Sequence, residues 1–154
     1  NKKIKLVVDI QCDEVFLKPK NLDKIIEFHL NNLNKYDVVI PHSITFDRNN
    51  KNYVKIISDK DCNVLYLSRS DSPYSFRSNF KGFKRHLDFI TFKPSFLSKF
   101  IKLKKRDLEK YEGIELLRVL ENGYKVGTIK MKEDSFSVNT IEDLKKANQI
   151  INKI

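Results

Sequence analysis

Cysteine and long apolar runs are both scarce in this 154-residue sequence. Its two cysteines, Cys12 and Cys62, are far apart and have neither a metal-binding nor a redox spacing. They therefore favour two reduced thiols over a disulfide framework. No apolar run approaches the roughly 20 residues that span a bilayer, and residues 1–3 lead into a predicted strand instead of the apolar part of a signal peptide. We expect a soluble, cytoplasmic protein without membrane contact.

Arginine is also scarce, which bears on the net charge of +10. The chain has 24 lysines but 6 arginines, and the lysines are spread along it, with one dense run at residues 99–106 that a solvated loop explains. Nucleic-acid binding needs clustered cations, so a basic nucleic-acid-binding module is the least favoured interpretation. A positive field would still attract an anionic nucleotide or an acidic sugar.

The chain is organised as one domain. It is 40% hydrophobic, which is enough for a core at this length, and no repeat or linker divides it. We therefore predict a single domain over residues 1–154.

Runs of β-type residues predict a sheet. Residues 5–10 are nearly all apolar, which is typical of a strand buried on both faces of a parallel sheet. Turn-forming residues at 59–63 separate two β-type runs and predict a hairpin. The predicted strands are 5–10, 38–40, 54–57, 64–67, 84–92 and 125–130.

Apolar residues at three- and four-residue spacing predict helices between these strands. The first begins at Pro19 and runs to about residue 34, and the second is a short helix over 94–100. A third covers 114–122, where Gly123 is placed to end it in a left-handed conformation. Alternation of strands and helices predicts a three-layer α/β domain with a mostly parallel sheet.

The last helix begins at a capping box formed by Thr140 and Asp143. Its predicted buried face is Leu144, Ala147, Ile150, Ile151 and Ile154.

Residues 70–81 form an irregular segment that is rich in serine. We expect the aromatic residues around it, Tyr66, Tyr74 and Phe76, to be packing residues.

The acidic residues after the first predicted strand are candidates for a site. Ligands bind at the carboxyl ends of strands in open α/β sheets, and Mg²⁺ favours carboxylate oxygens together with substrate phosphates. On residues alone, two interpretations stay open: Asp13 is a metal ligand, or Asp9, Asp13 and Glu14 are solvated loop acids.

Four ordered motifs carry a resemblance to a known family. They are residues 9–14 (DIQCDE), 64–69 (VLYLSR) with Pro73 and Tyr74, 85–87 (RHL), and 116–127 (LLRVLENGYKVG) followed by 137–144 (SVNTIEDL). Together they resemble the CMP-sugar synthetases, most closely the 3-deoxy-manno-octulosonate (KDO) cytidylyltransferases. The resemblance implies a nucleotide-diphospho-sugar transferase fold and a homodimer. It also implies a Mg²⁺-dependent reaction of CTP with an ulosonic acid sugar that gives a CMP-sugar and pyrophosphate.

The resemblance also implies roles for individual residues. Asp13 would be the catalytic metal ligand, with Asn139 at the position of the second ligand. The expected substrate-binding residues are Gln11, Arg69, Arg85, His86 and Glu115.

This sequence departs from the family pattern at three site positions. Cys12 replaces a glycine, Leu116 replaces a glutamine that reaches the sugar, and Asn139 replaces the aspartate of the second metal ligand. The glycine- and arginine-containing loop that holds the CTP triphosphate has no match in these residues, which correspond to the C-terminal two-thirds of the family domain. We expect the 154 residues alone to be inactive and a longer form to be active. The alternative is a non-catalytic relative that binds a sugar or a protein partner.

Overall fold

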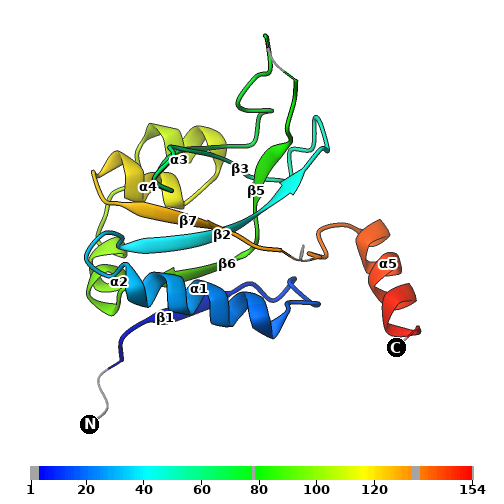
Figure 1. Ribbon diagram of the computed structural model, residues 1–154, viewed down its shortest axis with the longest axis horizontal. Coiled ribbons are helices and arrows are strands. Elements are labelled where there is room, and N and C mark those ends of the chain that lie inside the picture. The colour runs from blue at the N-terminus through cyan, green and yellow to red at the C-terminus, as the bar shows by residue number, and fades with distance from the viewer. Residues whose placement is uncertain (1–3, 78, 133–135, 154) are drawn as a thin grey trace.

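The computed structural model describes residues 4–77, 79–132 and 136–153 of the chain (Figure 1). The strands are β1 (Val7–Ile10), β2 (Val38–Thr45), β3 (Lys55–Ser58), β4 (Val64–Ser68), β5 (Phe83–His86), β6 (Phe89–Phe92) and β7 (Val126–Lys130). The helices are α1 (Pro19–Asn31), α2 (Pro94–Phe100), α3 (Asp107–Glu112), α4 (Leu116–Glu121) and α5 (Ile141–Ile151).

The sheet has the strand order β1-β6-β2-β5-β3-β4, and β7 lies beside β2. Within the described residues β2 and β7 form the parallel pair, and the other ladders are antiparallel. The prediction of a mostly parallel sheet was therefore wrong. A short connection explains the β3–β4 pair, because parallel neighbours need a crossover of about a dozen residues or more. The other antiparallel pairs join strands that are far apart in sequence, and their direction depends on which strands meet.

Strand β1 is at the edge of the sheet. Val7 to Ile10 pair with β6 alone, and the strand is partly exposed instead of buried on both faces. The apolar run that suggested a central strand is explained by its contact with a cavity, described below.

The predicted strand over 84–92 is two strands. Between them the Leu87 N–H donates to the Pro41 carbonyl, and Phe89 donates back to Leu87. β5 pairs with the second half of β2 and with β3, whereas β6 pairs with the first half of β2 and with β1. This change of partner places His86 and Asp88 between the ends of β5 and β6, where both line the cavity described below.

Two apolar clusters cover the two faces of the sheet. Val38 and Ile40 of β2 pack with Phe96 of α2 and Leu117 of α4, whereas the intervening Val39 packs with a second cluster that includes residues of α1. Alternate residues of a strand point to opposite faces, so helices cover both faces. The predicted three-layer arrangement is confirmed.

The structure confirms most of the local helix signals. Gly123 has φ 77°, and the Thr140–Asp143 capping box has both of its hydrogen bonds. Helix α1 ends at Asn31, three residues earlier than predicted, and α3 was not predicted.

The predicted buried face of α5 is wrong for most of its residues. Ala147 is buried, but Leu144 and Ile151 are 51% and 56% exposed and Ile150 is 39% exposed; Ile154 lies outside the described residues. Figure 1 shows the reason, since α5 is set apart from the sheet.

The aromatic side chains around the irregular 70–81 segment also include both packed and exposed residues. Tyr66 packs against the core as predicted, but Tyr74 and Phe76 are each 78% exposed. These two were wrongly predicted as packing residues of the chain.

Candidate functional site

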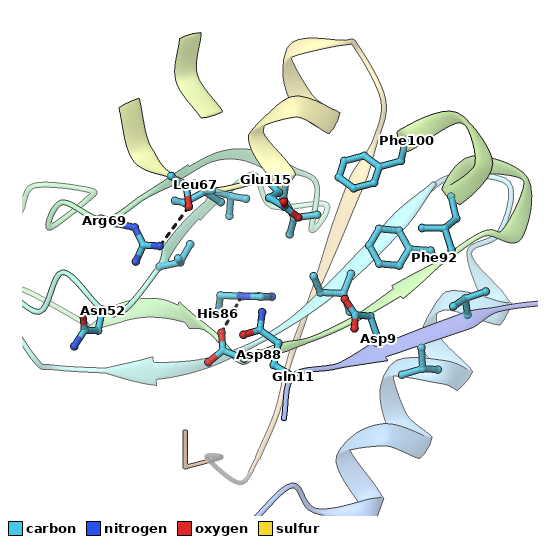
Figure 2. A pocket seen from close by; sticks show the side chains of 18 of the residues that line it. Asp9, Gln11, Asn52, Leu67, Arg69, His86, Asp88, Phe92, Phe100 and Glu115 are labelled. Atoms are coloured by element: carbon cyan, nitrogen blue, oxygen red, sulfur yellow. Dashed lines mark hydrogen bonds and ion pairs between the residues drawn. The ribbon is translucent and has the colours of Figure 1, made fainter. Parts of the chain in front are cut away.

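A cavity of about 760 Å³ opens at the edge of the sheet where β1, β4 and β6 approach the N-terminus of α4 (Figure 2). One wall is apolar and includes Val7 of β1 and Phe92 of β6. The other wall carries charged and amide groups. Five of the predicted site residues line the cavity: Gln11, Arg69, His86, Glu115 and Asn139.

Two predicted residues lie beside this cavity instead of in its lining. The Arg85 side chain lines a neighbouring cavity of about 300 Å³, and its guanidinium lies 3.8 Å from the ring centroid of Tyr53. Asn139 lines both cavities, so it lies between them. Asp13 lines neither cavity and lies in the loop that follows β1.

The loop after β1 meets the segment before α5, although the two are far apart in sequence. The Val138 N–H donates to the Asp13 carbonyl at 3.0 Å, and Glu14 and Ser137 form an antiparallel bridge. The segments that carry Asp13 and Asn139, which the resemblance assigns to one metal site, therefore meet through their backbones.

A cluster of acidic groups lies at this junction, in which Glu14 is buried and Asp13 and Asp88 are half-buried. The Ser137 hydroxyl is 2.6 Å from Glu14 Oε1 and 2.8 Å from Asp88 Oδ2. Oδ1 of Asp13 and Oε2 of Glu14 are buried without a hydrogen-bond partner. Burial raises the pKa of Asp88, and the negative charge of Asp13 raises it further, against the Ser137 hydroxyl, which lowers it.

His86 lies at the end of β5 beside this cluster. Burial lowers its pKa to about 4, although the charge of Glu14 acts in the opposite direction. The imidazole is therefore neutral near pH 7. Its Nδ1 is 3.7 Å from Asp88 Oδ1, and its Nε2 is buried without a partner. His86 thus offers a neutral hydrogen-bonding group to the cavity, not a positive charge.

The Arg69 side chain is held in place by backbone carbonyls. Its Nε donates to Glu112, one terminal nitrogen donates to Lys51, and the other donates to Gly113. Because a guanidinium has five N–H donors, two remain for a ligand in the cavity.

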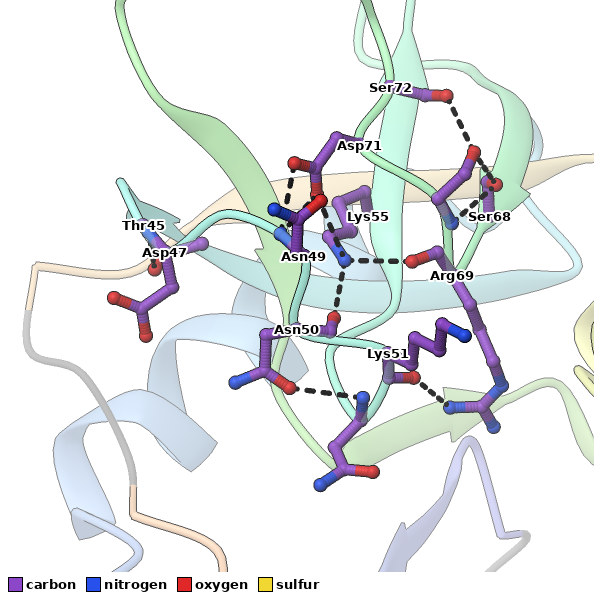
Figure 3. A network of polar contacts seen from close by, with 12 residues as sticks. Thr45, Asp47, Asn49, Asn50, Lys51, Lys55, Ser68, Arg69, Asp71 and Ser72 are labelled. Carbon is purple, nitrogen blue, oxygen red and sulfur yellow. Dashed lines mark hydrogen bonds and ion pairs between the residues drawn. The ribbon is translucent and has the colours of Figure 1, made fainter.

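A buried lysine fixes the backbone of Arg69 (Figure 3). Lys55 is fully buried, and its ammonium donates to the carbonyls of Asn50 and Arg69 and pairs with Asp71 at 3.6 Å. A buried charge is tolerated when it is paired and hydrogen-bonded, and here those contacts connect the 46–54 loop to the end of β4. Sequence reasoning missed Lys55, which carries no signal that separates it from the other lysines.

The family departures differ in their structural effect. Leu116 is 5% exposed and packs in the core, although it also borders the cavity. Cys12 is exposed and is not among the residues with positive φ, so its Cβ causes no backbone strain. Asn139 is exposed, and its N–H donates to Asp143 Oδ2 at 3.3 Å.

Asp88 is a cavity residue that sequence reasoning missed. The available signal was its position, because it is an acidic residue directly after residues 85–87 and between two β-type runs.

The described residues contain no group of three or more His, Cys, Asp or Glu side chains that could hold a metal ion. Mg²⁺, however, is usually held by one or two carboxylates together with substrate phosphates and water. The unpartnered, buried oxygen of Asp13 suits such a site.

Across the described ranges, no helix is long and apolar enough to span a membrane.

Comparisons with known proteins give the family. A family model described as Cytidylyltransferase matches residues 1–133. A 3-deoxy-manno-octulosonate cytidylyltransferase of Rickettsia conorii is 39% identical over 150 residues, which are 96% of this chain and 58% of that protein. The enzyme of the same name from Nitratiruptor sp. is 32% identical over 147 residues, or 93% of this chain and 61% of that protein. The chain thus spans about three-fifths of the length of these relatives.

Solved structures give the same fold. A CMP:2-keto-3-deoxy-manno-octonic acid synthetase in complex with CTP matches with a TM-score of 0.89 at 18% identity, over 97% of this chain and 62% of that one. A glucose-1-phosphate thymidylyltransferase from Bacillus anthracis matches with a TM-score of 0.64 at 14% identity, over 97% and 56%. Since the family model covers most of its length, this chain belongs to the cytidylyltransferase family.

Proposed function

We propose that the protein, in a form that includes the triphosphate-binding loop, transfers CMP from CTP to an ulosonic acid such as KDO and releases pyrophosphate. The observation that carries the proposal is the convergence of the loop after β1 with the segment before α5 beside a 760 Å³ cavity. That cavity has an apolar wall, and its polar wall includes Gln11, His86 and Glu115. The names of the curated relatives support the choice of CTP and KDO.

The chemistry follows from the residues present. In this reaction the anomeric hydroxyl of the sugar attacks the α-phosphorus of CTP, and the bond to pyrophosphate breaks. When bound, Mg²⁺ supplies neutralisation of the triphosphate charge. The two free N–H groups of Arg69 and the neutral imidazole of His86 position the sugar acid, while the apolar wall excludes water. No covalent nucleophile is needed for such a direct displacement.

We propose Mg²⁺ as the cofactor, held by Asp13 with the nucleotide phosphates. The amide oxygen of Asn139 is a neutral ligand at the second family position. Asp13 is partly buried, and its Oδ1 has no partner within the chain, which supports this role.

We also propose a cytoplasmic homodimer whose contact includes the 70–77 segment. The support is the pair of exposed aromatic side chains, Tyr74 and Phe76, on a segment that leads away from the cavity. Light scattering of the wild-type chain and of Phe76→Ser tests it, since removal of a contact residue should shift the protein to the monomer mass. Equal dimer masses would refute the role of Phe76, and a monomeric wild type would refute the dimer.

Pyrophosphate release tests the reaction. We expect none from the 154 residues alone with CTP, Mg²⁺ and a panel of ulosonic acids. We expect turnover from the same residues joined to the N-terminal part of the Rickettsia conorii relative. We expect the fusion protein to prefer a sugar other than KDO, because the Leu116 side chain cannot hydrogen-bond. Turnover by the 154 residues alone would refute the need for a triphosphate-binding loop of the family type. A folded but silent fusion protein would favour the non-catalytic relative instead.

A further inference from the structure

We propose that Asp88 supplies the second carboxylate of the metal site, in partnership with Asp13 and in compensation for the uncharged Asn139. The inference rests on the proposed function, because it concerns the same metal. It adds a residue that lies outside the four motifs on which the family resemblance rests.

The backbone of Asp88 is fixed to the loop that carries Asp13. The carbonyl of Asp88 accepts a hydrogen bond from the Gln11 N–H at 3.1 Å, and its own N–H donates to Glu14 Oε1 at 3.3 Å. Asp88 therefore lies opposite the start and the end of this loop. The carbonyl of Asp13 accepts from the Val138 N–H at 3.0 Å, and the neighbouring Ser137 hydroxyl donates to Asp88, so Asp13 and Asp88 both contact this segment.

The side chain of Asp88 is directed toward the cavity and toward the segment before α5. Its Oδ2 accepts from the Ser137 hydroxyl at 2.8 Å, and its Oδ1 is 3.7 Å from His86 Nδ1 (Figure 2). Ser137 is two residues before Asn139, and Asp88 and Asn139 line the same cavity.

Independent evidence for a ligand comes from buried polar atoms that have no partner. His86 is 7% exposed and lines the cavity beside Asp88, yet its Nε2 makes no hydrogen bond. Glu14 is 6% exposed, and its Oε2 is also unpartnered, as is Oδ1 of Asp13. Unpaired buried polar groups are costly, so a cluster of them at one junction points to a bound group.

The hydrogen-bond inventory also favours a cation. The single proton of the Ser137 hydroxyl lies between the carboxylates of Glu14 and Asp88 and can be donated to one of them at a time. The carboxylates of Glu14 and Asp88 therefore share one proton, and a divalent cation held by Asp88 and Asp13 would relieve their repulsion.

Other acidic residues of the cavity are less suitable. Asp9 is exposed on β1, and Glu115 is exposed at the start of α4. Neither is hydrogen-bonded to Ser137, whereas Asp88 is. Asp9 is therefore a matched control, because it carries the same charge in the same cavity.

Binding of Mn²⁺ to the 154-residue chain, measured by electron paramagnetic resonance at pH 7.5 with and without CTP, tests the proposal. We expect Asp88→Asn to weaken Mn²⁺ binding at least tenfold and Asp9→Asn to change it by about twofold or less. Adding Asn139→Asp to Asp88→Asn is expected to restore most of the lost affinity, since it returns a carboxylate to the junction. Circular dichroism and thermal melting verify folding, and Asp88→Ser replaces Asp88→Asn if the latter does not fold.

The outcomes separate this inference from the proposed function. Equal Mn²⁺ affinity of wild type and Asp88→Asn, with a loss in Asp13→Asn, would overturn the role of Asp88 and leave the metal-dependent function in place. Equal losses in Asp88→Asn and Asp9→Asn would also overturn it, since they would reflect only the charge of the cavity. Absence of Mn²⁺ binding with CTP in the wild-type 154 residues, and also in their fusion to the N-terminal part of the Rickettsia conorii relative, would overturn both.

Discussion

His42 provides a quantitative test of the electrostatics of the sheet. It lies in β2, is 5% exposed, and its Nδ1 is 2.8 Å from the Thr128 hydroxyl of β7. Burial is the main reason that the pKa of His42 is lowered from 6.5 to about 4, and the charges of Lys84, Lys130 and Lys24 contribute to the same shift. The folded chain therefore keeps this imidazole neutral in a pH range where the unfolded chain protonates it.

The sign and size of the effect follow from proton linkage. Because the unfolded state binds the proton more tightly, the contribution of His42 is present above pH 6.5 and is lost as the pH falls toward 4. Each tenfold difference in proton affinity corresponds to about 1.4 kcal/mol, so the free energy of unfolding falls by about 2 kcal/mol at pH 5 and about 3 kcal/mol below pH 4.

Urea unfolding of the wild type and of His42→Gln at pH 7 and pH 5 measures it. Glutamine retains a hydrogen-bonding group near Thr128 but does not titrate. Other groups titrate equally in both proteins, so their effects cancel in the comparison. We expect the wild type to lose about 2 kcal/mol more than His42→Gln between these pH values. Parallel losses, within about 0.5 kcal/mol, would refute the assigned burial and charge environment of His42.

Three further substitutions test the site and its support. Asp13→Asn is expected to weaken Mg²⁺-dependent nucleotide binding at least tenfold in calorimetric titration while leaving the melting temperature nearly unchanged; equal affinities would remove Asp13 from the site. Lys55→Met is expected to lower the free energy of unfolding by about 3 kcal/mol, because it leaves Asp71 and two carbonyls without their buried partner. Lys60→Met in the exposed β3–β4 turn is the control, and similar stability of the two variants would show that these contacts contribute little. Gly127→Ala is expected to cost about 1–3 kcal/mol in urea unfolding, since a Cβ there would lie 2.6 Å from the buried ring of Tyr36, and an unchanged midpoint would contradict this packing.

The sequence predicted elements with local signals better than their pairing. The capping box at Thr140 and the left-handed Gly123 depend on neighbouring residues, and both are confirmed. The direction of the β1–β6 pair depends on which strands meet, and periodicity does not carry that information. Residues 5–10 therefore suggested a central parallel strand, whereas β1 is an antiparallel edge strand whose apolar side chains border a cavity.

The site residues also divide into those that local motifs identified and those that depend on strand pairing. The motifs that resemble the family identified Gln11, His86 and Glu115, which line one cavity. Periodicity and motif matching could not identify Asp88, because its place beside the Asp13 loop is created by the change of strand partner at Leu87. The exposed apolar residues of α5 were predicted as buried because an amphipathic pattern indicates a face that avoids water but does not say what covers it.

The bridge between Glu14 and Ser137 has a consequence for the order of folding. It joins residues 123 positions apart, so closing it early would confine most of the chain at a large entropic cost. Local hairpins such as β3–β4 can form first, and the bridge becomes favourable only when the sheet has already brought both ends together. We therefore expect partially folded chains to lack the junction, and the proposed metal binding there to appear only at the final step of folding.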